Sequence, residues 1–254
     1  MFRIAICGLL ITTGFTASSA AKTIAGEARP CAGLPWFGPN DSLNTADLQV
    51  GNKDLRVQVN AKGPELHLRL EPDSRWKSTT NRMQRVGWIR VFSCETGALV
   101  QSLEAETLAD PENFIRFFKV EDVNFDGYLD VAVLREFGAK WGSQTWWVFS
   151  PRSGKFISND FTKALGEVMA NGLELDRGRH NIIAPHLTDL TGCGATEDIY
   201  HIEPSGRLML IHKEDIGARP DGCCTLTTWD RVKGQMQVTK VQQFPPYREP
   251  TGHP

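Results

Sequence analysis

The sequence predicts an all-β protein, an antiparallel hairpin array that is β-propeller-like or forms an irregular propeller with a calcium loop. Three observations predict this fold. Several short runs alternate apolar and polar residues, which is the period of a β-strand. A strand–turn–strand pattern with a glycine late in the turn occurs four times. An acidic loop lies between two further strand-like runs.

Composition narrows the range of functions. The chain of 254 residues carries 28 basic and 30 acidic residues, a formal net charge of -2, with the two signs interspersed. A nucleic-acid-binding protein usually concentrates basic residues on one face to neutralise phosphates, so the sequence disfavours that class. No apolar run beyond the N-terminus is long enough to span a bilayer, so we expect no membrane span.

Residues 1–21 are predicted to be a signal peptide. Arg3 provides a short basic start, residues 4–15 are apolar but too few for a membrane span, and residues 16–21 are small. Cleavage near Ala20 or Ala21 would deliver the chain to the periplasm or the medium. A buried helix at the start of the chain is the alternative, but the three parts of a secretion signal occur in order.

Cleavage would remove Cys7 and leave an odd number of cysteines. In an oxidising compartment this predicts disulfides with one thiol left over. We expect Cys31 to pair with Cys94, and Cys193 to pair with either Cys223 or Cys224. Sequence does not fix these pairings. A zinc site is the rival interpretation, although no C-x-x-C or H-x(3–5)-H spacing supports it.

The rest of the chain is divided by its composition into three parts: an irregular lead-in at 22–47, a β-propeller-like domain at 48–245 and a tail at 246–254. Strands are expected at 55–59 and 66–70, and a short helix at 161–170. The four hairpins are expected at 88–94 with 98–103, 146–150 with 155–158, 199–202 with 207–212, and 227–231 with 235–241. The spacing of their glycines only partly approaches that of propeller blades. Unrelated hairpins in a meandering all-β domain are therefore the alternative.

The acidic loop at residues 121–130 is the motif with the most specific chemistry. It reads D-x-N-x-D-G-x-x-D, which places oxygen ligands at alternate positions of a tight curl that Gly127 permits. Calcium prefers roughly six to eight oxygen ligands of this kind. The predicted calcium ligands are Asp122, Asn124, Asp126, the carbonyl group of Tyr128, and Asp130.

This loop differs from an EF-hand. Val133 stands where an EF-hand carries a bidentate glutamate, and both flanks read as strands instead of helices. Magnesium suits the loop less well because it requires a tighter octahedron. A polar turn without any metal is the alternative. In the calcium interpretation, the ion is a structural staple of one loop.

Residues 120–130, followed by a glycine-bearing loop and Trp147-Val148-Phe149-Ser150, resemble a known family. It comprises the calcium-binding, β-propeller-like periplasmic immunity proteins of bacterial type IV secretion killing systems, which inhibit a lysozyme-like effector. The hairpin from Ile89 through Gly97 to Gln101 is also similar to that family, and the likeness covers roughly residues 85–215. More broadly, the loop resembles the FG-GAP repeats of propellers.

The resemblance implies an inhibitory surface beside the calcium loop. The matching segment supplies the predicted partner-binding residues Gly138, Lys140, Trp141, Ser143 and Gln144. An exposed tryptophan offers apolar area, and its polar neighbours offer donors to the acidic cleft of a hydrolase. The alternative is that the tryptophans here belong to the core, since strand alternation turns one of Trp146 and Trp147 inward.

The sequence therefore predicts an exported, calcium-stabilised binding protein that acts as an immunity protein against a secreted cell-wall hydrolase effector. An FG-GAP-type adhesion or scaffold module is the alternative, and an uncharacterised hydrolase is a third possibility. We expect no enzyme activity. The sequence contains no G-x-S-x-G or H-E-x-x-H motif, and its histidines are scattered.

Overall fold

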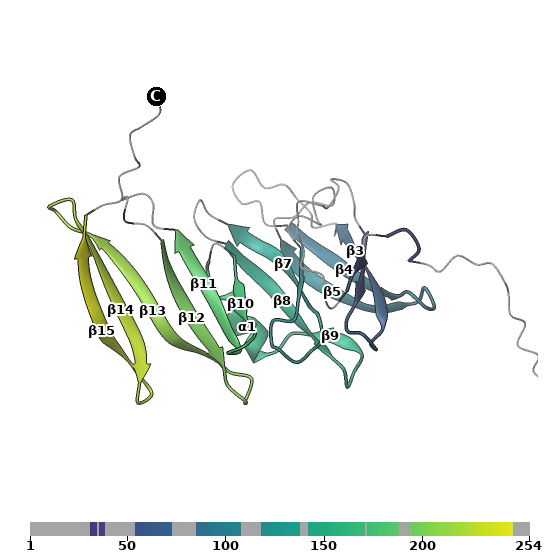
Figure 1. Cartoon of the computed structure of the whole chain (residues 1–254). Coiled ribbons are helices and arrows are strands. Elements are labelled where there is room, and N and C mark those ends of the chain that lie inside the picture. The colour runs from purple at the N-terminus through teal and green to yellow at the C-terminus, as the bar shows by residue number, and fades with distance from the viewer. Residues whose placement is uncertain are drawn as a thin grey trace, which may run out of the picture.

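The computed structural model describes residues 31–34, 36–38, 54–72, 85–107, 118–137, 142–170, 172–187, 193 and 195–245. The predicted signal peptide, most of the lead-in and the tail lie outside these ranges. Strands dominate the described chain, and they form three sheets that lie in a row (Figure 1). Within these ranges, no helix is long and apolar enough to cross a membrane. The all-β prediction is confirmed.

The first sheet has five strands in sequence order: β1 (Trp36–Phe37), β2 (Asp54–Gln58), β3 (Glu65–Pro72), β4 (Arg85–Ser93) and β5 (Leu99–Thr107). All neighbours are antiparallel except β1 and β2, which are parallel. Strand β1 lies within residues 22–47, which we expected to be irregular. The Cys31–Cys94 disulfide ties this segment to the end of the sheet, which explains why a short strand can form there.

The second sheet has four antiparallel strands: β6 (Phe118–Glu121), β7 (Asp130–Phe137), β8 (Gly142–Ser150) and β9 (Lys155–Ile157). Helix α1 (Asp160–Gly166) follows it and is shorter than expected. Asn159 begins the helix by accepting a hydrogen bond from the backbone amide of Thr162, in a capping box. The acidic loop connects β6 to β7, so its predicted strand flanks are confirmed.

The third sheet has six antiparallel strands in sequence order. They are β10 (Glu174–Asp176), β11 (Asn181–Leu187), β12 (Ala195–Ile202), β13 (Leu208–Ala218), β14 (Cys224–Val232) and β15 (Gln235–Phe244). All four predicted hairpins are present. Their turn glycines have φ values of 71° at Gly97, 67° at Gly154, 80° at Gly206 and 84° at Gly234. The left-handed conformation is the reason for glycine at these positions.

The second sheet is buried on both faces. Trp147 and Phe149 of β8 belong to the cluster shared with the first sheet, while Trp146 and Val148 belong to the cluster shared with α1 and the third sheet. Because successive side chains point to opposite faces, each of the two tryptophans enters a different core. Alternation predicted one inward tryptophan, and both are buried because each face of this sheet is covered.

The described residues form two disulfides. Cys31 pairs with Cys94, as expected, and Cys193 pairs with Cys224. The half-buried Cys223 is a free thiol. Cys224 is the first residue of β14 and is buried, whereas Cys223 precedes the strand, and only Cys224 is bonded to Cys193. The disulfides are consistent with an oxidising, periplasmic or extracellular compartment.

Candidate functional site

The acidic loop is held in a tight bend by its own side chains. Asp122 Oδ1 accepts a hydrogen bond from the backbone N–H of Asp126 at 3.0 Å, and Oδ2 accepts from that of Gly127 at 3.1 Å. Asn124 Oδ1 also accepts from the Asp126 amide, at 3.1 Å. Asp126 Oδ1 accepts from the backbone N–H of Tyr128 at 2.9 Å. These bonds satisfy amide donors that no strand ladder reaches, so the bend is well defined.

Two residues of this bend have left-handed backbone conformations. Gly127 has a φ of 85°, as its place in the motif predicts, and Phe125 has a φ of 59°. A phenylalanine is unusual in this region. Its ring stacks on the ring of His180 from the third sheet, with centroids 5.1 Å apart. This contact joins the loop to the turn between β10 and β11.

Asp130 connects the loop to the neighbouring strand. Its side chain is fully buried. Its Oδ2 accepts a hydrogen bond from the backbone N–H of Val123 at 3.1 Å, and its Oδ1 accepts from that of Phe149 in β8 at 2.8 Å. Burial raises the pKa of Asp130 to about 8, against the opposing effect of these amides. The site therefore holds a carboxyl group whose ionisation is costly without a neighbouring cation.

Two further acids at the start of the loop, Glu121 and Asp122, also have raised pKa values. Burial raises the pKa of Asp122, and the charge of Asp126 acts in the same direction. Burial likewise raises the pKa of Glu121. Arg177 opposes both shifts, and its Nη1 lies 3.6 Å from Asp122 Oδ2. The arginine side chain therefore already supplies positive charge next to Asp122, at the start of the loop.

The predicted calcium ligands agree with calcium in their chemistry, because Asp122, Asn124, Asp126 and Asp130 offer only oxygen acceptors toward a cation. Each oxygen that accepts one N–H keeps a second lone pair. However, within the described residues no three His, Cys, Asp or Glu side chains converge as a metal site. Binding would require the carboxylates to draw closer, and Arg177 competes for the same charge. Calcium binding stays a prediction.

The predicted partner-binding segment is only partly described. Gly138, Lys140 and Trp141 lie outside the described residues. Ser143 is described, and its hydroxyl group is buried between Arg135 and Glu136, at 3.3 Å from Arg135 Nε and 3.2 Å from Glu136 Oε1. This position contradicts the expectation that Ser143 offers an exposed donor to a partner.

Gln144 is half-buried, with its Oε1 buried and without a hydrogen-bond partner in the described part of the chain. It lines a small cavity of about 50 Å³ together with Trp146 and Leu165. The part of Gln144 that carries its acceptor therefore faces the interior. Any partner surface on this hairpin must depend mainly on its tip, residues 138–141.

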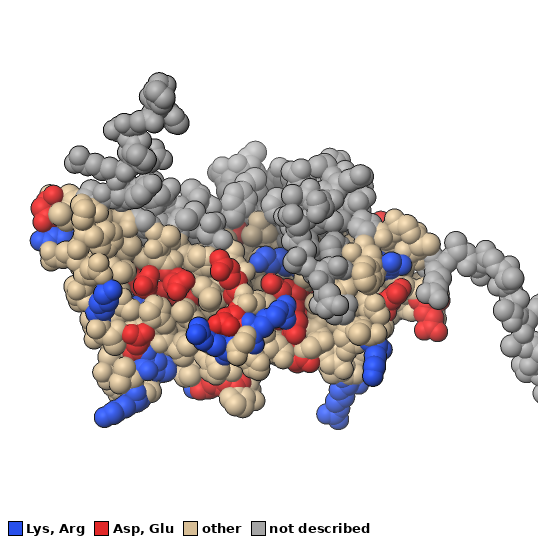
Figure 2. Space-filling model, viewed as in Figure 1, with Lys and Arg blue, Asp and Glu red and all other residues tan. Residues whose placement is uncertain are grey.

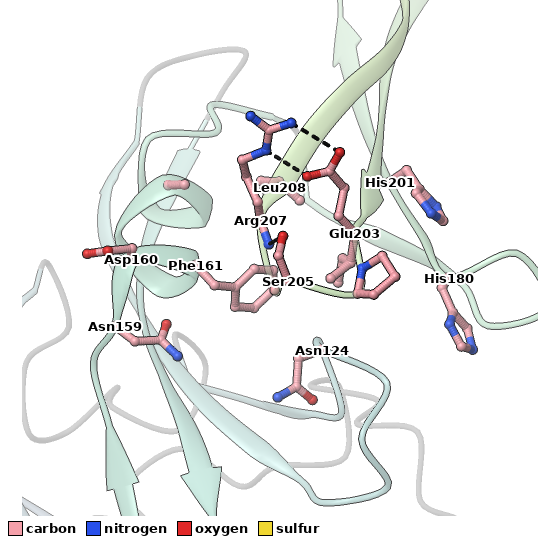
Figure 3. Close-up of a pocket in the computed structure, with 14 residues that line it drawn as sticks. Asn124, Asn159, Asp160, Phe161, His180, His201, Glu203, Ser205, Arg207 and Leu208 are labelled. Carbon is pink, nitrogen blue, oxygen red and sulfur yellow. Dashed lines mark hydrogen bonds and ion pairs between the residues drawn. The ribbon is translucent and has the colours of Figure 1, made fainter. Parts of the chain in front are cut away.

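A larger pocket lies beside the acidic loop, between α1 and the β12–β13 hairpin (Figure 3). Its volume is about 900 Å³. The pocket combines residues from segments far apart in sequence. Its lining includes Asn124, Asn159, Phe161, Ser205, Arg207 and Leu208. Figure 3 shows the Phe161 ring extending from the helix toward Ser205, with Asn159 and Asn124 below it.

Sequence reasoning identified only Asn124 among the residues of this pocket as a site residue. The turn at residues 204–206 was recognised as a hairpin, and Phe161 as part of a helix, but neither feature carries a local signal for a pocket. Their convergence depends on how the second and third sheets pack. The one weak signal for a binding site is the turn at residues 204–206, because exposed loops often carry functional residues.

Surface charge agrees with the composition. On the face shown in Figure 2, acidic and basic side chains are interspersed without a field of one sign. Several charged side chains of the described residues also neutralise each other in ion pairs. One example is Arg207, whose Nε lies 2.7 Å from Glu203 Oε2. Such a surface gives no support to a nucleic-acid partner.

No family model and no curated protein matches this chain. Among solved structures, the chain is similar to a Xanthomonas type IV secretion system related protein. The sequence identity is 14%, the TM-score is 0.48, and the alignment covers 76% of this chain and 96% of that chain. A likeness at this level supports no statement about function.

Proposed function

We propose that this protein is an exported binding protein that inhibits a peptidoglycan hydrolase of the lysozyme type. The recognition segment is the tip of the β7–β8 hairpin around Lys140 and Trp141. The choice of target rests on the family that the loop at 120–130 and its neighbouring hairpins resemble. The disulfides agree with an exported protein that meets such a hydrolase outside the cytoplasm.

The observation that carries the proposal is the direct link between the acidic loop and the hairpin. Asp130 ends the loop, begins β7 and accepts a hydrogen bond from Phe149 in β8. The same residue is fully buried, so it ties the loop to both strands of the hairpin at the end opposite residues 138–141. A rigid loop would fix this end of the two strands that carry the recognition segment, which would lower the entropy lost on binding.

Calcium is the proposed stabiliser of the loop. Asp122, Asn124, Asp126, Asp130 and the Tyr128 carbonyl group would hold it. When bound, the ion supplies positive charge that offsets the repulsion among the carboxylates and favours their ionised form. The side chains themselves orient the loop amides through their hydrogen bonds.

Inhibition would occur by occlusion. The cleft of a lysozyme-type hydrolase carries two carboxyl groups that must reach the glycosidic bond. A lysine pairs with such acids, and a tryptophan fills an apolar subsite in the manner of an interface anchor. Ser143 has no part in this contact, because its hydroxyl group is committed to Arg135 and Glu136.

The inhibition test compares Trp141→Ala with Trp36→Ala. Trp36 is 44% exposed and lies on the first sheet, so it controls for the loss of an exposed tryptophan elsewhere. In lysis assays with lysozyme-type hydrolases, we expect Trp141→Ala to weaken inhibition about 30-fold or more, the effect of losing an anchor worth about 2 kcal/mol. Trp36→Ala should inhibit normally. Absence of any complex at micromolar concentration would refute the proposal and favour an FG-GAP-type scaffold.

The metal test is independent of the target. Calcium at about ten times its dissociation constant should stabilise the wild-type fold by about 1.4 kcal/mol. Asp126→Asn should abolish this gain, because it replaces one carboxylate of the predicted ligand set. Thermal unfolding with calcium or with a chelator measures both. An equal calcium response in the variant would remove calcium from the proposal.

A further inference from the structure

The pocket between the acidic loop, α1 and the β12–β13 hairpin has the size of a ligand site. Its volume of about 900 Å³ is at the upper end of the range for small-molecule sites, roughly 300–1,000 Å³. It also lies where two packed units meet, since α1 packs against β8 of the second sheet and the hairpin belongs to the third sheet. Pockets of this kind commonly bind ligands.

One side of the pocket is apolar. Phe161 is only 7% exposed and belongs to the core cluster between the second and third sheets. Ile202 and Leu208 pack against that cluster from the hairpin side. These side chains are anchored in the core, so the apolar surface is preformed. A ligand that fits here needs an apolar face of its own.

The charged groups around the pocket are paired with one another. Arg207 and Glu203 form a bidentate pair, with Nε to Oε2 at 2.7 Å and Nη2 to Oε1 at 3.1 Å. Asp160 lies at the rim with its Oδ1 3.4 Å from Lys163 Nζ. Because each acid has a basic partner, the pocket presents little net charge to a ligand. This pairing disfavours phosphates and cations and favours a neutral molecule.

Two imidazole rings also line the pocket: His201 Nδ1 lies 3.0 Å from Asn181 Oδ1, and His180 stacks on Phe125. The remaining polar groups are amides and a hydroxyl group. Asn159 Oδ1 accepts a hydrogen bond from the Thr162 amide at 2.9 Å, and this bond leaves its two N–H donors for other acceptors. Asn124 donates one N–H to Asp126 Oδ2 at 2.9 Å and retains the other. Ser205 adds a hydroxyl group on the opposite wall. Neutral donors and acceptors of this kind match hydroxyl and amide groups.

We propose that this pocket binds a neutral saccharide that carries N-acetyl groups. The acetamide carbonyl oxygen accepts from the Asn159 and Asn124 amides, the acetamide methyl group and the C–H face of the sugar pack on the half-buried Ile202 and Leu208 beside the accessible edge of Phe161, and the sugar hydroxyl groups bond to Ser205. The site is separate from the β7–β8 hairpin tip. It does not require the hydrolase function, so the failure of either proposal leaves the other intact.

The test uses the β-1,4-linked trimer of N-acetylglucosamine as the probe and cellotriose, which lacks acetamide groups, as the matched control sugar. Calorimetric titration measures affinity, and ligand-observed NMR identifies which protons of the trimer contact the protein. We expect binding at sugar concentrations on the order of 10 mM or below, with the strongest transfer to the acetamide methyl groups, and at least tenfold weaker binding of cellotriose.

Two variants connect the binding to the pocket. Ala164 is exposed on α1 and lines the pocket, so Ala164→Trp fills it without removing a contact. Lys155→Trp adds the same bulk to an exposed side chain of β9 that neither lines the pocket nor pairs with one of its charged residues. We expect at least a tenfold loss of affinity in the first variant and no change in the second.

Asn159→Asp refines the assignment, because aspartate caps a helix as well as asparagine does but offers no N–H donor. We expect this variant to fold normally and to bind the trimer at least tenfold more weakly. The proposal is overturned by no trimer binding, by equal binding of cellotriose, or by unchanged binding in Ala164→Trp. Circular dichroism and the unfolding midpoint establish that each variant is folded.

Discussion

Asp130 is the residue that connects the acidic loop most directly to the core. Its two oxygens accept hydrogen bonds from amides on different segments, Val123 in the loop and Phe149 in β8. Both amides are buried with it and have no water as an alternative partner. A buried donor that loses its acceptor costs about 1–3 kcal/mol. The stability of this region should therefore depend strongly on one side chain.

We predict that Asp130→Ala lowers the free energy of unfolding by about 2–4 kcal/mol in the presence of a chelator, because two buried amides lose their acceptor. Asp126→Ala is the control. That side chain is exposed and also accepts from a backbone amide, but water can replace it. The control should cost less than about 1 kcal/mol. Urea denaturation measures both values, and equal losses in the two variants would contradict the role of Asp130.

The outer hairpins of the third sheet are the elements with the fewest buried side chains. In β15, Val238 and Val241 are 53% and 61% exposed. Polar contacts between the side chains of neighbouring strands help to hold these hairpins together. Asp230 of β14 accepts a hydrogen bond from Thr239 of β15 and lies 2.7 Å from His212 Nδ1 of β13. One carboxylate thus joins three strands.

These contacts give a pH dependence. The Thr239 hydroxyl group, and then His212, hold the pKa of Asp230 below its usual range. A carboxyl group with a lowered folded-state pKa stabilises the fold above its unfolded pKa of about 3.9, and this contribution is lost as the pH falls through the folded value. The contribution is present at neutral pH.

We predict that Asp230→Asn lowers the free energy of unfolding at pH 7 by less than about 1 kcal/mol, the range for exposed ionic contacts. The difference from wild type should shrink as the pH falls below about 4, because the unfolded carboxylate then takes up a proton while the folded one, whose pKa is lowered, does so only at a lower pH. Glu174→Gln, at an exposed acid in β10, is the control and should show no such trend. Denaturation curves measured from pH 3 to 7 would contradict the prediction if the difference stayed constant.

At the scale of the whole molecule, three sheets are joined in series by two cores. The first core lies between the first and second sheets, and the other between the second sheet, α1 and the third sheet. Val131 and Val133 of β7 face the first core while Ala132 faces the other, and all three are fully buried. The second sheet therefore contributes to both cores, whereas β14 and β15 contribute little to either.

This arrangement predicts a gradient of local stability. In native-state hydrogen exchange, the amides of β7 and β8 should be the slowest, and those of β15 should exchange faster although that strand is longer. The reason is that opening β15 exposes little buried apolar surface. Mass spectrometry of exchanged peptides checks the order. Protection of β15 equal to that of β7 would show that another surface covers this strand.

Local features of the fold were predictable from the sequence because they depend on short-range physics. Alternating runs such as 66–70 form strands wherever one face is buried. Gly97 and Gly154 occupy left-handed turns that other residues adopt only with strain. The acidic loop bends because its own carboxylates accept its own amides. None of these features needs a distant partner.

Packing between sheets decided the rest. The sequence leaves Cys223 and Cys224 as equal partners for Cys193, and the fold pairs Cys193 with Cys224, the first residue of β14. Ser143 was placed on a partner surface by likeness to a motif, but the fold buries it against Arg135.

The sequence by itself determined the strands, the turns and the oxygen-rich bend, because each is stabilised by hydrogen bonds and backbone preferences within a few residues. Only the tertiary structure decided which faces are covered and which residues share a pocket. Asn124, Phe161 and Leu208 come together there because the second and third sheets bury a common apolar core. Burial of that kind depends on segments far apart in the chain, so no local pattern records it.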